Sequence, residues 1–321
     1  MKIVFFGTPE YVQPVAEMLH KTFSPSGENK SSIVAVVTQK PKPVGRKKIL
    51  SHSPIDKWAH NKDILIINES HELLDSGLEA DIGILASFGE IISKDVLNYF
   101  PHGILNIHPS LLPKYRGASP VRAAIAAGET ETGATIIKLD EELDHGKIIS
   151  QFNIEIEKGD TTKTLREKLF TQSAEVLRAL IKPYIAGKIT LKTQNEKEAT
   201  FTTLVTKKEG FIKPKYIECA IEGKIFKDKW DISFIKVGPK RDILKISSSP
   251  ENIDCFVRAM DPWPTAWTTV KPYPKKGLKK LKILKAHLSG KKLVLDEVQL
   301  EGKNPVSWKQ FREGYPTVMF L

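Results

Sequence analysis

Cysteine is scarce in this sequence, with Cys219 and Cys255 as the two among 321 residues. Two cysteines cannot build a disulfide framework or supply a common structural zinc site, so we expect a cytoplasmic protein without a metal. No apolar run approaches the ~18 residues that a membrane-spanning helix needs. The chain enters a strand-like run at Met1–Phe6 directly. We therefore expect neither a membrane span nor a cleaved targeting peptide.

Acidic residues are scarce only in the C-terminal third of the chain. Residues 1–206 hold 25 Lys and Arg against 25 Asp and Glu, whereas residues 207–321 hold 24 against 13. The net charge of +11 therefore comes entirely from the C-terminal third. This asymmetry indicates a neutral domain that carries the chemistry, joined to a basic domain that binds an anion, with nucleic acid as the first candidate. A lysine-rich surface that only maintains solubility is the alternative at this point.

The glycine-rich loops of nucleotide-binding enzymes are also missing. After its first strand-like run the chain continues Gly7-Thr8-Pro9-Glu10-Tyr11, without the further glycines that let a backbone approach a pyrophosphate. No G-x-x-x-x-G-K-[ST] pattern occurs either. Both absences argue against a dinucleotide-binding domain and against an enzyme driven by a nucleoside triphosphate.

Short apolar runs recur through the N-terminal part of the chain at a spacing typical of βαβ units. They lie at 2–6, 33–37, 64–67, 82–86 and 104–107, separated by longer segments, several of which have the length of a helix. Two further strands are expected at 135–139 and 147–156, followed by a helix that ends near Pro183. We therefore predict an α/β domain with a mostly parallel sheet over residues 1–188.

The remainder of the chain has a different pattern. Residues 189–206 are polar and show no sustained periodicity of apolar residues, which predicts a linker. Within residues 207–321, short strand-like pieces alternate with turns that contain proline or glycine. These pieces lie at 232–237, 242–246, 281–284 and 293–298. The pattern favours a smaller all-β domain, either a barrel or a sandwich.

Two polar residues, Asn106 and His108, stand at the end of the fifth predicted strand. Residues two apart on a strand project from the same face, so the amide and the imidazole are expected side by side. Pro109 ends the strand and places residues 110–113 in a loop at the carboxyl edge of the sheet, where open α/β folds bind ligands. A buried histidine that is satisfied by its neighbours would also explain the pattern.

A second polar segment, Asp140–Gly146, follows the sixth predicted strand. Asp144 lies two residues before the glycine that opens the next strand, so its carboxylate could point back over the sheet edge toward His108. A carboxylate favours a protonated imidazole, and together with Asn106 this makes a donor set suited to a developing oxyanion. No Ser or Cys lies in a nucleophile elbow, so an acyl group would pass directly between two bound substrates.

These motifs resemble the folate-dependent formyltransferases. The resemblance rests first on Asn106–Pro113, Tyr115–Gly117 and Leu143–Gly146. Other segments resemble the members of that family that act on initiator tRNA: Phe6–Glu10, Thr38-Gln39 with Gly45-Arg46, Arg116–Pro120, Glu131–Gly133 and Asp261–Pro264. The resemblance spans nearly the whole chain. Its Asn-x-His and Leu-Asp-x-Gly elements are shared with family members that formylate glycinamide ribonucleotide or sugars, so they indicate the chemistry rather than the acceptor.

The resemblance implies a Rossmann-like formyltransferase sheet in the first domain and an oligonucleotide-binding (OB-like) barrel in the second. It implies 10-formyltetrahydrofolate as the donor and the free amine of initiator methionyl-tRNA as the acceptor, with Asn106, His108 and Asp144 as catalytic residues. The donor pocket would be lined by Ser110, Leu111, Leu112, Pro113, Phe88 and Gly89. We expect a monomer with no membrane partner.

A basic loop is the second functional segment. Residues 40–48 contain five cations, no acid and two prolines, and the resemblance implies that this loop enters the acceptor arm of the tRNA. The expected contacts are Lys42, Arg46, Lys47 and Lys48, with Arg46 favoured because a guanidinium can bind phosphate at two points or stack on a base. Lysine clusters at 275–276, 279–282 and 291–292 could follow the phosphate backbone.

Two other functions remain open from the sequence. The same chemistry could formylate an amino sugar nucleotide or a purine precursor, although neither acceptor explains a basic second domain. A tRNA-binding protein without catalysis would keep the lysines but would not need Asn106, His108 and Asp144 together.

Overall fold

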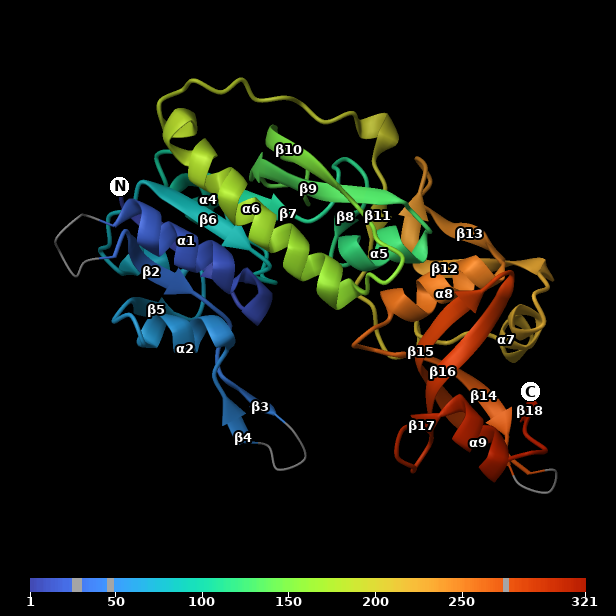
Figure 1. The fold of residues 1–321 in the computed structure, drawn as a ribbon. Coiled ribbons are helices and arrows are strands. Elements are labelled where there is room, and N and C mark those ends of the chain that lie inside the picture. The colour runs from blue at the N-terminus through green and yellow to red at the C-terminus, as the bar shows by residue number, and fades with distance from the viewer. Residues whose placement is uncertain (25–30, 45–48, 274–276) are drawn as a thin grey trace. The chain divides into compact units, whose positions relative to one another are not determined.

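The computed structural model describes residues 1–24, 31–44, 49–273 and 277–321, and contacts among them form two compact units (Figure 1). Unit 1 comprises Met1–Arg116, Gly133–Ile154 and Arg166–Glu196, and unit 2 comprises Gly117–Thr132, Glu155–Leu165 and Lys197–Leu321. The chain therefore crosses between the units more than once. The domain limits expected from the sequence, with a linker at 189–206, remain a prediction.

Unit 1 is built on a seven-stranded sheet. Its strands are β1 (Ile3–Gly7), β2 (Ile33–Val37), β5 (Leu65–Ile67), β6 (Ile82–Ala86), β7 (Ile104–His108), β9 (Glu131–Lys138) and β10 (Ile148–Glu155). They lie in the order β10-β9-β7-β6-β1-β2-β5, in which β7 to β5 are parallel and β9 runs antiparallel to β7. The mostly parallel α/β sheet predicted from the sequence is confirmed.

The apolar runs form strands because helices cover both faces of this sheet. The helices are α1 (Gln13–Phe23), α2 (Pro54–His60), α3 (Glu72–Asp75), α4 (Lys94–Asn98) and α6 (Thr162–Ile185). Ile3 and Phe5 of β1 belong to a core shared with α1, α2 and α6, whereas Val4 and Phe6 belong to a core shared with α3 and α4. Alternate residues of the strand thus serve opposite faces. A strand buried on both faces is a continuous apolar run, which explains why these strands could be predicted from the sequence.

A short hairpin in unit 1 carries the start of the basic loop. β3 (Lys42–Val44) and β4 (Ile49–Ser51) pair antiparallel, and Lys42 lies opposite Ser51. The hairpin projects away from the main sheet in Figure 1. Ile49 and Leu50 are 65% and 61% exposed, so this arm has apolar as well as basic side chains on its surface. Arg46, Lys47 and Lys48 lie outside the described residues.

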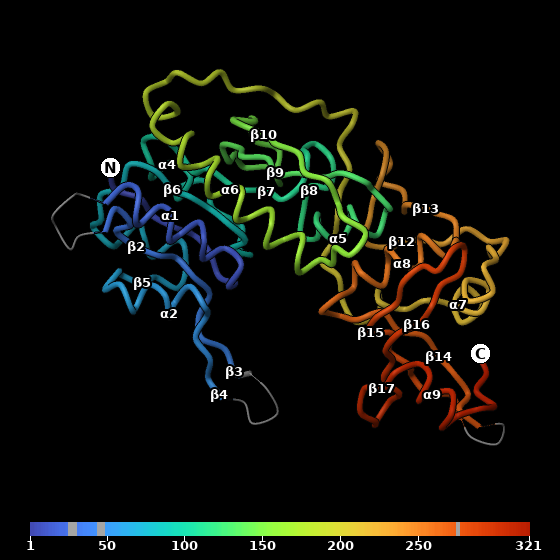
Figure 2. The backbone as a smooth tube through the Cα atoms, in the orientation of Figure 1, coloured from blue at the N-terminus to red at the C-terminus, as the bar shows by residue number. Residues whose placement is uncertain are grey.

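An extended segment follows α6, and we call residues 187–196 the strap. Figure 2 shows it running without a helix beside the outer strand of the sheet. Ile148 of β10 and Lys192 of the strap form an antiparallel bridge, with N–H to O distances of 2.8 and 2.9 Å. The strap leads into the short 3₁₀ helix η2 (Glu196–Glu198). Part of the segment predicted as a linker is therefore attached to the sheet of unit 1.

Unit 2 contains most of the remaining strands. These are β11 (Phe201–Thr202), β12 (Phe226–Val237), β13 (Asp242–Ser248), β14 (Ala266–Lys271), β15 (Lys279–Ser289), β16 (Lys292–Leu300), β17 (Val306–Ser307) and β18 (Met319–Phe320). One antiparallel sheet has the order β17-β16-β15-β14-β18, and β12 pairs with β11 and β13 in a second sheet, which β8 (Arg116–Gly117) extends. The sequence predicted an all-β second domain, and its antiparallel β-sheets are confirmed.

Helices accompany these strands in unit 2, and the sequence analysis did not predict them. They are α5 (Pro120–Ala126), α7 (Pro214–Ile221), α8 (Pro250–Ala259) and α9 (Trp308–Gly314). The helix α8 begins with Ser249 as its N-cap, whose side chain accepts a hydrogen bond from the backbone of Asn252. Short amphipathic helices of this kind are held by packing on the sheet more than by their own propensity, so local sequence signals them poorly.

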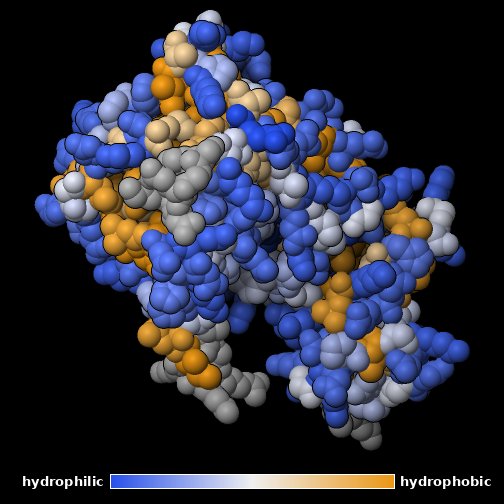
Figure 3. Space-filling model, turned by 60° about the vertical axis from the view of Figure 1, so that its left-hand side comes forward, coloured by the Kyte–Doolittle hydropathy of each residue, from blue (hydrophilic) through white to orange (hydrophobic). Residues whose placement is uncertain are grey.

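The surface is largely hydrophilic on the face seen in Figure 3, where apolar residues form small separate groups. Single exposed apolar side chains, such as Ile91 at 91% and Leu204 at 73%, occur in both units. Scattered exposure of this kind is ordinary for a folded protein. None of the helices in the described part of the chain is long and apolar enough to cross a bilayer.

Candidate active site

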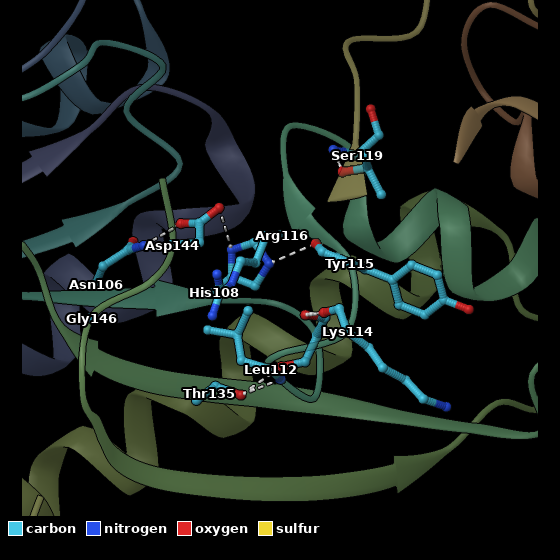
Figure 4. Close-up of polar contacts among 12 residues, drawn as sticks. Asn106, His108, Leu112, Lys114, Tyr115, Arg116, Ser119, Thr135, Asp144 and Gly146 are labelled. Atoms are coloured by element: carbon cyan, nitrogen blue, oxygen red, sulfur yellow. Dashed lines mark hydrogen bonds and ion pairs between the residues drawn. The ribbon is translucent and has the colours of Figure 1, made fainter. Parts of the chain in front are cut away.

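Asn106 and His108 project from β7, and the loop between β9 and β10 brings Asp144 over them (Figure 4). Asn106 Nδ2 donates to Asp144 Oδ1 at 3.3 Å, and His108 Nδ1 lies 3.4 Å from Asp144 Oδ2. The side chains of His108 and Asp144 are 5% and 12% exposed. The structure thus brings together the three residues that the sequence analysis expected to meet, and their catalytic role stays a prediction.

The second nitrogen of His108 also has a partner. Its Nε2 lies 3.0 Å from the carbonyl oxygen of Tyr115. Because a carbonyl can only accept a hydrogen bond, Nε2 carries a proton. The other ring nitrogen faces a carboxylate, so a second proton there would also be well placed. The surroundings of His108 therefore suit the doubly protonated imidazolium.

Burial and charge act on the pKa of His108 in opposite directions. Burial lowers it, because a charged ring loses hydration, while the charge and hydrogen bond of Asp144 and the carbonyl of Tyr115 raise it. Arg116 lowers it further through its positive charge. The raising effects are larger, so the pKa of His108 lies above its ordinary value. The contacts of His108 thus favour its charged form against the effect of burial.

Two residues that contact His108 have unusual backbone geometry. Asp144 and Tyr115 adopt positive φ angles of 48° and 61°, a left-handed conformation that non-glycine residues rarely take. Such residues collect at functional sites, where the surrounding structure holds them in place. Gly146 is required in the same loop, because a Cβ atom there would lie 1.9 Å from the carbonyl oxygen of Lys138. The loop around Asp144 is therefore closely specified.

The loop after β7 is fixed by hydrogen bonds to its own backbone. Thr135 Oγ1 donates to the carbonyl of Ser110 at 2.7 Å and accepts from the amide of Leu112 at 3.1 Å (Figure 4). Ser110 Oγ donates to the carbonyl of Lys114 at 2.6 Å. Ser110 and Leu112 are buried, whereas Leu111 and Pro113 are partly exposed. These contacts give the loop a rigid shape, and its role in donor binding stays a prediction.

Phe88 and Gly89, the other expected donor contacts, differ in their surroundings. Phe88 is buried in the core and packs edge-on against Phe6 with ring centroids 5.7 Å apart. Its carbonyl accepts a hydrogen bond from Gln39 Nε2 at 3.2 Å. Gly89 is exposed and has a φ of +84°. Of this pair, Gly89 is the one that offers an accessible backbone.

A cavity of about 770 Å³ borders the same loop in unit 1. It is formed by α4 and the residues after it, together with the end of β9 and the first part of the loop. Its walls include Leu97, Asn98, Phe100, Leu139, Glu142 and His145. Its volume lies in the range of roughly 300–1,000 Å³ that small-molecule sites occupy. The cavity is therefore large enough for a cofactor-sized ligand, and His145, the chain neighbour of Asp144, is part of its wall.

His145 follows Asp144 in the chain but turns to other partners. His145 Nδ1 lies 2.7 Å from Asp140 Oδ2, and its Nε2 lies 3.6 Å from Glu196 Oε1. The hydrogen bond to Asp140 raises the pKa of His145, and burial opposes that rise. The side chain of His145, in the cavity wall, is therefore engaged with Asp140 and Glu196.

The sequence analysis missed several residues that support the site. Thr135 was seen only as part of a strand, although its hydroxyl joins two parts of the loop after β7. Gln194 lies in the strap, where no periodicity distinguished it. Arg116 appeared only as part of a family motif. No group of three or more His, Cys, Asp or Glu among the described residues is arranged to hold a metal ion.

Comparison with known proteins places the chain in a family. The chain belongs to the formyl transferase family: residues 1–181 match the family described as formyl transferase, and residues 236–293 match its C-terminal domain. Its relatives include the methionyl-tRNA formyltransferase of Listeria monocytogenes serovar 1/2a, 35% identical over 281 residues, which cover 85% of this chain and 77% of that protein. The methionyl-tRNA formyltransferase of Enterococcus faecalis is 35% identical over 276 residues, with 84% and 75% covered.

Solved structures show the same fold at lower identity. An N-formyltransferase from Helicobacter canadensis, in complex with folinic acid and dTDP-3-aminofucose, has a TM-score of 0.62 and 18% identity over 96% of this chain and 98% of its own. A methionyl-tRNA formyltransferase from Clostridium thermocellum has a TM-score of 0.54 and 17% identity, with 94% and 98% covered. At these identities the two structures establish the fold and leave the acceptor undecided.

Proposed function

We propose that this protein transfers the formyl group of 10-formyltetrahydrofolate to the α-amino group of initiator methionyl-tRNA. The observation that carries the proposal is the meeting of Asn106, His108 and Asp144, in which one carboxylate contacts both the amide and the imidazole. None of the three is a nucleophile suited to an acyl intermediate, so the amine attacks the formyl carbon directly. Relatives of this chain that are named methionyl-tRNA formyltransferases support the choice of acceptor.

Negative charge develops on the formyl oxygen as the amine attacks. An amide nitrogen has two N–H donors, and the bond from Asn106 to Asp144 uses one of them. The other hydrogen is available to the developing oxyanion, and the positive charge of the His108 ring stabilises the same oxygen. Fixed donors in a site closed to water are among the strongest contributions to catalysis.

The attacking amine must lose a proton, and the folate nitrogen must gain one. The new C–N bond forms as the C–N bond to the folate breaks. Asp144 is the base beside the reacting atoms, so it accepts the proton of the amine and passes it toward the departing nitrogen. His108, held protonated, keeps the carboxylate ionised until that step. The transfer therefore balances without a metal or an oxidant.

The donor needs a site that ends beside Asp144. We assign it to the cavity bordered by α4 and residues 138–145, whose wall includes His145, the chain neighbour of Asp144. Apolar side chains of Leu97, Phe100 and Leu139 suit the flat faces of a pteridine ring, and Asn98 supplies a polar group for its edge. The loop of Ser110 to Pro113 and the backbone of Gly89 remain expected contacts for the same ligand.

The acceptor is a polyanion, and unit 2 offers a cluster of cations to receive it. Lys280 lies over the ring of Trp267, with Nζ 3.7 Å from the centroid. Burial lowers the pKa of Lys280, and the positive charges of Lys282 and Lys207 lower it further. Three cations that repel one another are stabilised when phosphates come between them. An amino sugar nucleotide or a purine precursor would leave this cluster without a purpose.

Parallel incubations test the function. The purified protein is given 10-formyltetrahydrofolate with charged initiator tRNA, with charged elongator tRNA, or with an amino sugar nucleotide. We expect formylmethionine on the initiator tRNA at the highest kcat/KM. Faster formylation of the sugar would reassign the acceptor, and no transfer to any acceptor would refute the enzymatic function.

A further inference from the structure

Arg116 is a buried cation that the proposed mechanism does not use. It is 2% exposed, and its guanidinium is directed at the strap (residues 187–196). Nε and Nη2 donate to Gln194 Oε1 at 3.1 and 2.8 Å, and Nη1 and Nη2 donate to the carboxylate of Glu196 at 2.9 and 2.6 Å. A buried charge is tolerated only when it is paired and hydrogen-bonded. Arg116 therefore holds Gln194 and Glu196 in defined positions.

Gln194 extends this anchor to the catalytic loop. Its Nε2 donates to the carbonyl of Asp144 at 2.8 Å and to the carbonyl of Gly146 at 2.9 Å. Gln194 is 6% exposed. Its amide oxygen accepts two hydrogen bonds from Arg116 while its nitrogen donates two to the loop, which uses the full capacity of the group. One side chain thus connects a buried cation to the backbone on both sides of His145.

The backbone held by Gln194 carries the carboxylate of the site. Asp144 has a φ of 48°, and a residue in this left-handed conformation persists only where its surroundings hold it. A rotation of its peptide group would move the carboxylate away from His108 and Asn106. The two hydrogen bonds from Gln194 oppose that rotation directly.

We infer that Gln194 is a positioning residue, anchored by Arg116, that fixes the loop of Asp144 in the geometry required for formyl transfer. The inference rests on the proposed function, because the role of Asp144 is part of that proposal. It assigns a function in catalysis to a segment that, by sequence, only connects two domains. A glutamine that merely stabilises the fold would not affect the contact between Asp144 and His108.

Two variants test the inference, with one matched control. Gln194→Glu keeps an acceptor for Arg116 but removes the donor to the loop. Gln194→Met has a similar size and no charge, and it removes both kinds of hydrogen bond. Thr193→Ala changes the exposed neighbour of Gln194 on the same strap and serves as the control. Each variant is checked for folding by circular dichroism before kinetics.

We expect kcat for formyl transfer to fall about 10- to 100-fold in both Gln194 variants, because small displacements of a catalytic group have effects of this size. The KM values for donor and tRNA are expected to stay within about twofold, and Thr193→Ala to match the wild type. Wild-type kcat in folded Gln194→Glu would overturn the inference. If Gln194→Met does not fold, Gln194→Glu still decides the matter.

A second readout is independent of activity. The pKa of His108 is measured by NMR in protein with labelled histidine. Its signal is identified as the one that is missing from the spectrum of His108→Gln. Gln194→Met should lower this pKa, because Asp144 is no longer held against the ring, and an unchanged pKa would overturn the inference. Asp144→Asn is assayed alongside: normal transfer by that variant would refute the proposed catalytic role, while the pKa in Gln194→Met would still decide whether Gln194 positions the loop.

Discussion

His108 and Asp144 come from distant parts of the chain, yet His108 Nδ1 lies 3.4 Å from Asp144 Oδ2. A strand supplies the imidazole and a loop supplies the carboxylate. Burial lowers the pKa of the ring, and the contacts with Asp144 and Tyr115 raise it by more. The proposed function of the site depends on this pair, because a neutral ring would be a weaker partner for a developing oxyanion.

Replacing the carboxylate should remove most of the activity. Asp144→Asn keeps the size of the side chain but cannot accept the proton of the attacking amine. We expect kcat to fall about 10²- to 10⁴-fold, the range for loss of a general base, measured with saturating donor and tRNA. Asp75→Asn, an exposed acid of α3, is the control and should keep wild-type kcat. A loss of less than tenfold in Asp144→Asn would speak against its role.

The raised pKa of His108 predicts how stability depends on pH. Burial lowers this pKa and the contacts with Asp144 and Tyr115 raise it by more. A group whose pKa is higher in the folded state stabilises the fold fully below its unfolded pKa of about 6.5, and this contribution is lost as pH rises through the folded pKa. We expect the unfolding free energy of the wild type to exceed that of His108→Gln by more near pH 6 than near pH 9. Urea titration at both pH values measures this difference. An advantage that grows with pH contradicts this assignment.

Gly146 should not tolerate a side chain. The Cβ of Gly146→Ala would meet the carbonyl of Lys138, which belongs to the backbone and cannot move without shifting β9. We expect a loss of about 1–3 kcal/mol in unfolding free energy, typical of overpacking, together with reduced formyl transfer. Gly159→Ala is the control, since nothing lies within 4 Å of a Cβ there. Equal stability of the two variants would show that the loop adapts more easily than its geometry suggests.

Filling the cavity beside α4 should weaken donor binding. Asn98 lines the cavity and is exposed, so Asn98→Trp places a large side chain in it with little effect on the core. We expect the KM for 10-formyltetrahydrofolate to rise about tenfold or more while the KM for tRNA stays near the wild-type value, since loss of well-placed contacts in a pocket has effects of this order. Leu74→Trp, on the exposed surface of α3, controls for the added ring. An unchanged donor KM would move the donor site elsewhere.

The lysines of unit 2 should govern the salt dependence of tRNA binding. We expect Lys282→Gln to weaken binding and to reduce the slope of log affinity against log salt by about one, the value for one lost phosphate contact. Lys215→Gln is the control, because Glu218 already pairs with Lys215 at 2.7 Å. Filter binding at several salt concentrations measures both. A slope shared by wild type and Lys282→Gln would exclude Lys282 from the tRNA surface.

The parallel sheet could be predicted because a strand that is buried on both faces is a continuous run of apolar residues. β6 and β7 are apolar along most of their length, and this holds whatever packs on them. The helices of unit 2 have a weaker pattern in the sequence. α7 and α8 are short and depend on the strands that cover them, so a local pattern did not reveal them.

By itself, the sequence determined which chemistry was possible: the spacing of Asn106 and His108 placed them on one face of a strand, and the excess of cations predicted that the second domain binds an anion. The tertiary structure alone decided how the third residue is held. Gln194 lies in a polar stretch without period, and its two hydrogen bonds to the loop of Asp144 exist only because the strap folds back along β10. Contacts between segments far apart in a chain depend on the path of the backbone between them, and that path is not encoded in any local pattern of residues.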